Sequence, residues 1–526
     1  MQPHIRNTDI LVIGGGAAGL RAAIEARRKG FDVVLASKAP AGYGSSTFYA
    51  GGGFRAAFGR YSPRQHFEET IRGGKFLNSQ EHVKRLVDEG PTRLRELHDF
   101  GVTFRERDGG IGVTDGPLTP GKGLALPLAQ FAGQSGVHLL RGVMALEFLV
   151  DDRVHGAVFY NALQARLEVV TSGATILATG GYSQLLSRTD NPVQVTGDGV
   201  AMALRAGAEL ADMEFVQFFP LGLAQQGKPA WLIPARPAVL TNALGEDLLM
   251  KYAFDKPLSS AAVENRDMLS RAIWTEIVQG RGVGDAVIMD TSGIDPSTMG
   301  SLTLLGVRPP RIPVAPTAHF TMGGIKVDID GKTGVPGLFA CGEVTSGVHG
   351  ANRLGGNALT EAIVFGAAAG QAAVGEVADR EQSRVDETIL SDWDRRIEAH
   401  RRGHIEVGGL RSTLQNLMWR NCGVKRDGAG LLAARRWIEE TKGRVGELYA
   451  EDHFEILKAF ELENMITLAE VVVKSSLARE ESRGAHFRAD YPDQNDSSWL
   501  KRTTAVLGRS GLSIGTMPVG LAYLRE

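Results

Sequence analysis

Residues 9–38 read DILVIGGGAAGLRAAIEARRKGFDVVLASK, and this stretch decides the fold. Residues 9–13 predict a buried strand, residues 14–19 form a G-x-G-x-x-G loop, and a helix is expected over residues 20–29. A second strand is expected over residues 32–36. Strand, glycine loop, helix and strand in this order are typical of a dinucleotide-binding fold. We therefore expect an α/β protein with a Rossmann-type domain.

The three motif glycines each have a physical role in such a loop. Gly14 allows the tight turn, Gly16 lets the backbone approach a pyrophosphate, and Gly19 lets the helix pack closely on the strand. The helix N-terminus then offers free N–H groups to the phosphates. The second strand ends in Ser37 and Lys38, where NAD-binding proteins usually carry an acidic ribose ligand, which argues against a simple NAD site.

The bulk composition narrows the class of protein. A chain of 526 residues is long enough for two to four domains, and a net charge of −2 gives no electrostatic reason to bind nucleic acid or an anionic membrane. We see no signal peptide and no apolar run of membrane-spanning length; the small residues 362–374 better suit a buried helix. We expect a cytoplasmic protein, whose contact with a membrane would run through a partner.

Two cysteines, Cys341 and Cys422, stand far apart in the sequence. They rule out a disulfide framework and an iron–sulfur cluster held by thiolates of this chain. No metal site is expected.

A series of further motifs follows the glycine loop. Together they resemble the succinate dehydrogenase/fumarate reductase flavoprotein family, which includes L-aspartate oxidase, over nearly the whole chain and in the family order. The motifs are SSTFYAGGG at 45–53, ATGG at 178–181, TGDG at 196–199, MEFVQF at 213–218, HFTMGG at 319–324, GE at 342–343, HGANRLGGN at 349–357 and ESRGAHFR at 481–488.

The resemblance implies a split FAD-binding domain with an inserted α+β capping domain, followed by a C-terminal helical domain. The expected boundaries are 1–222 and 315–378 for the FAD-binding domain, 223–314 for the capping domain, 379–480 for the helical domain and 481–526 for a C-terminal domain. The apolar pattern of residues 379–477, with Leu414, Leu417 and Leu431, independently favours a helix bundle.

By resemblance, FAD is the cofactor. A histidine that binds the flavin covalently in many family members is replaced here by Ser46, so we expect FAD to be bound non-covalently. The resemblance places the cofactor contacts at Gly14, Gly16, Gly19, Ser37, Lys38, Ser45, Ser46, Thr47, Gly52, Gly53, Asp198, Glu343, Ala358 and Leu359.

Three residues match the family's catalytic positions. His319 and Arg353 would bind and polarise a substrate carboxylate, for which a planar guanidinium is well suited, and Arg266 would exchange a proton with the neighbouring carbon. Taken singly, His319 also fits a core histidine, and Arg266 fits a surface arginine paired with Glu264 or Asp267. The surrounding motifs favour the catalytic interpretation.

The sequence departs from the family at the other end of the substrate. Phe219 stands where a substrate-binding histidine belongs, and the segment that supplies a threonine and a relay carboxylate is shortened to residues 233–240. A carboxylate facing Phe219 would lack a donor, at a cost of a few kcal/mol. We expect one carboxylate site to be kept and the other remodelled, with Arg236 as a candidate replacement.

Three functions remain open at this point. The chain is a fumarate reductase or succinate dehydrogenase-like flavoprotein that acts on a small carboxylate, an L-aspartate oxidase-like enzyme, or a catalytically decayed flavin-binding subunit of a complex. Residues 496–501 and 517–519 resemble the complex-forming members, so an iron–sulfur electron-transfer subunit is the expected partner.

Overall fold

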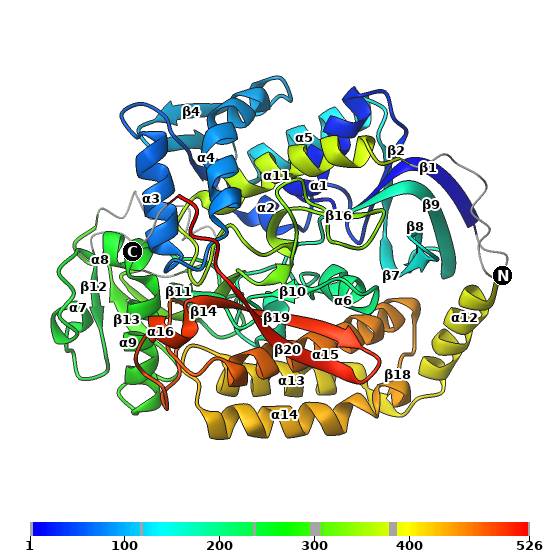
Figure 1. The fold of residues 1–526 in the computed structure, drawn as a ribbon. Coiled ribbons are helices and arrows are strands. Elements are labelled where there is room, and N and C mark those ends of the chain that lie inside the picture. Colours follow the sequence, from blue (N-terminus) through cyan, green and yellow to red (C-terminus); the bar gives the residue numbers. More distant parts are fainter. Residues whose placement is uncertain are drawn as a thin grey trace.

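The computed structural model describes residues 4–115, 119–234, 238–294, 306–307, 309–377 and 387–523. Its centre is a seven-stranded sheet in the order β6-β2-β1-β9-β8-β7, with β16 also paired to β9 (Figure 1). β1 runs parallel to β2 and β9, whereas β7 and β8 join antiparallel. The strands are β1 (His4–Ile13), β2 (Val33–Ser37), β6 (His138–Arg141), β7 (Val143–Val150), β8 (Val154–Asn161), β9 (Arg166–Leu177) and β16 (Leu338–Ala340).

The expected α/β architecture is confirmed, but the first elements are longer than the sequence pattern indicates. β1 starts at His4 because it pairs with the long strand β9 from that residue onward. Helix α1 (Ala17–Arg28) starts three residues before the predicted Leu20, because Gly16 is already extended at the N-cap. The motif glycine Gly19 therefore lies inside the helix.

The two faces of the central sheet are covered differently. Ile10 and Val12 pack with helices α1, α5 (Lys122–Gln134) and α11 (Asn357–Val374), which lie together at the top of Figure 1. Leu11 and Ile13 face the β7–β8 side. The residues expected to form a buried helix lie in α11, which packs tightly on α1. A Cβ at Gly366 would come within 2.6 Å of a carbonyl oxygen of α1.

A small antiparallel sheet and three helices extend this first region. The sheet has the order β3-β5-β4. Its strands and the neighbouring helices are β3 (Gly53–Arg55), β4 (Phe104–Arg107), β5 (Gly110–Val113), α2 (Ser46–Tyr49), α3 (Pro63–Gly73) and α4 (Gln80–Arg95).

A second antiparallel sheet, β11-β14-β13-β12, has its own apolar core with helices α7 to α9. The ladder between β11 and β14 is continuous from Val216 to Leu223, so the expected boundaries at 222/223 and 314/315 fall within one pair of strands. The division into domains therefore stays a prediction. The elements are β11 (Val216–Leu223), β12 (Val239–Thr241), α7 (Leu248–Lys251), α8 (Leu258–Glu264), α9 (Arg266–Val278), β13 (Val287–Asp290) and β14 (Arg311–Thr321).

The helices after residue 387 lie on the side of the molecule opposite to α1, α5 and α11 (Figure 1). Leu414 and Leu431 are fully buried in their core, and Leu417 packs against it. The elements are α12 (Glu387–Arg401), β17 (Ile405–Glu406), α13 (Val407–Cys422), α14 (Gly428–Lys442), β18 (Leu448–Tyr449) and α15 (His453–Ala478).

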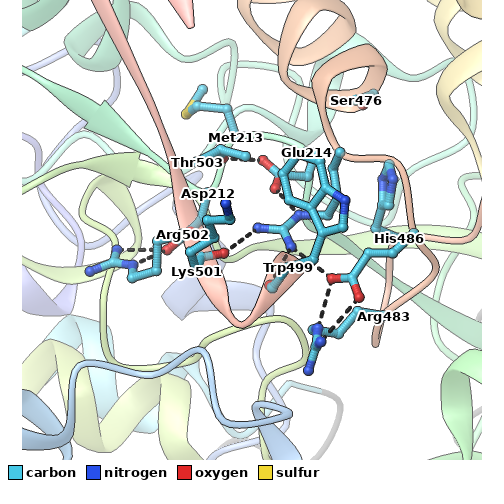
Figure 2. Close-up of polar contacts among 12 residues, drawn as sticks. Asp212, Met213, Glu214, Ser476, Arg483, His486, Trp499, Lys501, Arg502 and Thr503 are labelled. Carbon is cyan, nitrogen blue, oxygen red and sulfur yellow. Dashed lines mark hydrogen bonds and ion pairs between the residues drawn. The ribbon is translucent and has the colours of Figure 1, made fainter. Parts of the chain in front are cut away.

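The C-terminal segment is tied to the centre by a sheet and by buried ion pairs. The sheet has the order β15-β10-β19-β20, and α6 lies between the two halves of the chain. Arg479 donates to Glu214 at 2.6 Å and to Glu481 at 2.7 Å, and Arg502 pairs with Asp212 at 2.6 Å (Figure 2). The elements are α6 (Asp198–Arg205), β10 (Leu210–Ala211), β15 (Gly324–Ile325), α16 (Asp496–Trp499), β19 (Lys501–Gly508) and β20 (Gly511–Pro518).

Candidate active site

The glycine loop joins the carboxyl end of β1 to the N-terminus of α1 without room for side chains. Gly14 has φ +123°, and a Cβ there would lie 2.1 Å from the carbonyl oxygen of Ala178. A Cβ at Gly19 would lie 2.0 Å from the carbonyl oxygen of Gly14. The backbone is thus packed as closely as a pyrophosphate-binding turn requires, with the helix N-terminus next to it.

Residues 45–53 lie against this loop. Thr47 Oγ1 accepts a hydrogen bond from the first N–H of α1, that of Ala17, at 3.1 Å. Ser46 Oγ donates to Asn191 Oδ1 at 3.2 Å. The other expected contacts of this segment, Ser45, Gly52 and Gly53, lie at the N-cap of α2, in a turn with φ +66°, and at the start of β3, respectively.

Lys38, just beyond the end of β2, is held by two carboxylates. Its Nζ lies 2.7 Å from Asp198 Oδ2 and 2.6 Å from Glu461 Oε1. Burial disfavours the charged amine, but the two carboxylates outweigh it, so the pKa of Lys38 lies above its ordinary value. Ser37 Oγ donates to the carbonyl of Ala39. Lys38 and Asp198 are thus neighbours, and Glu461 is a partner that the sequence did not reveal.

Glu343 is a buried carboxylate near the other end of the glycine loop. Burial raises its pKa to about 7, although it accepts hydrogen bonds from the N–H and Oγ1 of Thr321. A Cβ at Gly181 would lie 2.5 Å from Glu343 Oε1, so this glycine leaves the carboxylate accessible. Ala358 and Leu359 lie in the first turn of α11.

These features meet the demands of FAD. The glycine loop and the N-terminus of α1 suit the pyrophosphate, and a buried carboxylate such as Glu343 is a good acceptor for ribityl or ribose hydroxyl groups. The residues present therefore fit this cofactor.

Arg266 and Arg353 come together through Gln217 of β11. Arg266 Nη1 donates to Gln217 Oε1 at 3.0 Å, while Gln217 Nε2 donates to the carbonyl oxygen of Arg353 at 2.9 Å. Arg266 also donates through Nε to the carbonyl of Val263. The guanidinium of Arg353 stacks over the ring of Phe320, 4.6 Å from its centroid.

Neither guanidinium has a carboxylate partner among the described residues. The surface pairing considered for Arg266 does not occur, because Glu264 pairs with Lys256 and Asp267 with Arg271. Burial lowers the pKa of Arg266 to about 9, helped by the charge of Arg353, and burial lowers the pKa of Arg353 to about 10. Two buried cations without a counterion are costly, and a bound carboxylate would relieve that cost.

His319 is held by a carboxylate that the sequence did not reveal. Its Nδ1 lies 2.8 Å from Asp190 Oδ2, and Asn191 Nδ2 donates to Asp190 Oδ1 and to the carbonyl of His319. Because the carboxylate accepts from Nδ1–H, the second ring nitrogen, Nε2, is left for a substrate. The ring of Phe219 lies 5.9 Å from the imidazole, centroid to centroid.

Asp190, Gln217 and Glu461 were missed because their partners are far away in the sequence. Asp190 and His319 are 129 residues apart, and Lys38 and Glu461 are 423 apart. A weak signal existed for Gln217, which belongs to the quoted MEFVQF motif. Arg236, the candidate for a second carboxylate, lies outside the described residues.

Two further properties bear on the class of protein. No helix within the described ranges is long and apolar enough to cross a membrane. The same part of the chain contains no cluster of three or more histidine, cysteine or acidic residues suited to a metal ion.

Comparison with known proteins identifies the family. The family described as FAD binding domain matches residues 9–359, and the one described as fumarate reductase flavoprotein C-term matches residues 411–525. An uncharacterized FAD-dependent oxidoreductase of Methanocaldococcus jannaschii is 37% identical, over 93% of this chain and 94% of that protein. One subunit of the fumarate reductase (CoM/CoB) of Methanothermobacter marburgensis is 35% identical, over 94% and 96%.

A solved structure agrees. FrdA of E. coli quinol fumarate reductase, in a mutated form, superimposes with a TM-score of 0.90 at 29% identity and covers 99% of this chain and 98% of its own. The chain belongs to the fumarate reductase/succinate dehydrogenase flavoprotein family and is an FAD-binding, flavin-dependent oxidoreductase that acts on CH–CH groups.

Proposed function

We propose that this chain transfers a hydride between FAD and a carbon–carbon bond activated by a single carboxylate, with the site for a second carboxylate remodelled. The observation that carries the proposal is the pair of buried guanidinium groups, Arg266 and Arg353, for which the described residues offer no carboxylate. His319 beside them supplies a third group able to donate to an anion.

The residues divide the chemistry between binding and proton transfer. Arg353 and His319 bind one carboxylate of the substrate and withdraw charge from the adjacent double bond, which readies the far carbon for hydride. When bound, FAD supplies the hydride or accepts it. Arg266 exchanges a proton at the neighbouring carbon, and its pKa of about 9 makes it a stronger acid than an ordinary arginine.

Phe219 supports a change at the opposite end of the substrate. Its ring lies beside His319 and offers no hydrogen-bond donor, so a second carboxylate there would be desolvated without a partner, at a cost of roughly 1–3 kcal/mol or more. A substrate with an apolar or larger group at this end avoids the cost.

Anaerobic reoxidation of the dithionite-reduced holoprotein tests the function. We expect rapid reoxidation of the flavin band by a monocarboxylic enoate and slow reoxidation by fumarate, because the fumarate dianion would place one carboxylate against Phe219. A panel of enoates with different groups at the far carbon defines the substrate, and L-aspartate with hydrogen peroxide detection controls for oxidase activity. Turnover of fumarate with a micromolar KM would show that the dicarboxylate site is intact.

We propose that FAD is bound non-covalently. Ser46 stands where a covalently bonded histidine would be needed, and its hydroxyl donates to Asn191. Acid precipitation should therefore release all of the flavin into the supernatant. Yellow colour that stays with the denatured pellet would contradict this.

Asp190 positions His319 in this scheme. Asp190→Asn keeps the size of the side chain but removes the charge that holds the Nδ1 proton of His319. We expect KM for the best enoate to rise about tenfold, a loss of 1.4 kcal/mol, with a smaller change in kcat and unchanged FAD content. Asp108→Asn, which alters an exposed ion pair with Arg60, is the control. Equal losses in both variants would remove Asp190 from the binding site.

The electron partner is proposed to be a separate iron–sulfur protein. Cys341 and Cys422 are both buried, and burial raises the pKa of each thiol; that of Cys422 rises to about 12. Neither is suited to hold a cluster as a thiolate. The relative from Methanothermobacter marburgensis is itself named as one subunit of a reductase, which makes a partner protein the natural proposal.

A further inference from the structure

A second cavity lies at the edge of the central sheet, apart from the glycine loop. Its volume is about 320 Å³, the size of a small-metabolite site. Arg6 lies eight residues before Gly14, which corresponds to roughly 25 Å along an extended strand. The polar side chains that line it come from the edge strand β6 and from β1, β8 and β9: Arg6, His138, Arg141, Asn161, Arg166 and Glu168.

The cavity collects more positive than negative charge. Three arginines face one glutamate, and Glu168 pairs with Arg166 at 3.4 Å. In the part of the chain that the structure describes, Arg6 and Arg141 have no carboxylate partner. Arg6 Nη1 instead lies 3.1 Å from His138 Nε2, and since arginine can only donate, this nitrogen must accept. Two basic groups in contact, with no anion between them, indicate that an anion is missing.

Three buried polar atoms of the lining residues have no hydrogen-bond partner among the described residues. They are Nε of Arg6, Nε of Arg166 and Oε2 of Glu168. Such atoms are costly unless a partner satisfies them. The first two require an acceptor, and the third requires a donor such as a hydroxyl group. The ligand that satisfies all three carries an anionic group and a hydroxyl group on one small skeleton.

We propose that this cavity binds a small phosphorylated polyol, with its phosphate on Arg6 and Arg166 and a hydroxyl group donating to Glu168. Guanidinium groups match the oxygens of a phosphate in bidentate geometry, and Arg141, exposed on β6, adds a third cation at the mouth. The site is independent of the proposed reaction, because the substrate and flavin residues come from other elements of the fold.

Isothermal titration of the FAD-loaded full chain with ribose 5-phosphate tests the site. Inorganic phosphate and ribose serve as partial probes. We expect saturable binding of ribose 5-phosphate with a Kd below about 1 mM, weaker binding of phosphate and none of ribose. The flavin spectrum should not change on binding.

Paired variants localise the binding. Arg6→Gln with Arg166→Gln should weaken ribose 5-phosphate binding at least about tenfold. Arg141→Gln, which alters an exposed side chain and leaves the core untouched, provides a second variant in the cavity. Arg60→Gln, which removes an exposed arginine elsewhere, should bind as the unmodified chain does. Absence of saturable binding, or equal affinity in the cavity variants and the unmodified chain, would overturn the proposal.

Discussion

Arg353→Leu is expected to lower kcat/KM by about 10³-fold, or 4 kcal/mol of transition-state stabilisation, while the protein keeps its FAD. The guanidinium is buried over Phe320 and has no carboxylate partner among the described residues. Its charge is thus available to a substrate carboxylate, and its interaction strengthens as negative charge moves onto that group during hydride transfer. The measurement is steady-state turnover with the best enoate.

Arg353→Lys separates charge from geometry. Lysine keeps the positive charge but loses the fork that binds two carboxylate oxygens, so we expect only partial recovery. Arg153→Leu is a matched control, because this arginine binds the carbonyls of Gly173 and Glu376, away from the site. Full activity of Arg353→Leu would identify the chain as a flavin-binding subunit without catalysis.

Local features of the site were predictable from the sequence. The tight turn at Gly14 and the contact of Gly19 with the strand depend on neighbours within a few residues, so a short motif specifies them. The start of α1 was less predictable. Gly19 weakens a helix, and the packing that compensates for it, against the backbone of Gly14, cannot be seen in a periodic pattern.

Pairings across the fold were not predictable. The fate of Arg266 depends on Gln217, a residue of another strand, and nothing near Arg266 in the sequence distinguishes it from a surface arginine. Likewise, Asp190 reaches His319 only because the chain between them folds back on β14. The resemblance supplied the roles of Arg266 and His319, but the partners that hold them came from the structure.

Arg479→Met is expected to destabilise the protein by about 3–5 kcal/mol. Arg479 is fully buried between Glu214 and Glu481 and donates to the carbonyls of Trp499 and Lys501 (Figure 2). Methionine fills much of the volume but leaves two carboxylates in an apolar setting without their counterion. Urea unfolding of the holoprotein, followed by tryptophan fluorescence, measures the loss.

The size of this effect depends on which charges remain. Glu214→Gln and Glu481→Gln, added to Arg479→Met, remove the stranded negative charges and should recover part of the stability, since a neutral buried cluster costs less than an unbalanced one. Arg402→Met, an exposed arginine paired with Glu398, should change stability by less than about 0.5 kcal/mol. If Arg479→Met alone matched that control, the carboxylates would have to be protonated or hydrated in the native protein. Because Glu214 directly precedes β11, which carries Gln217, loosening this cluster should also weaken the hold on Arg266.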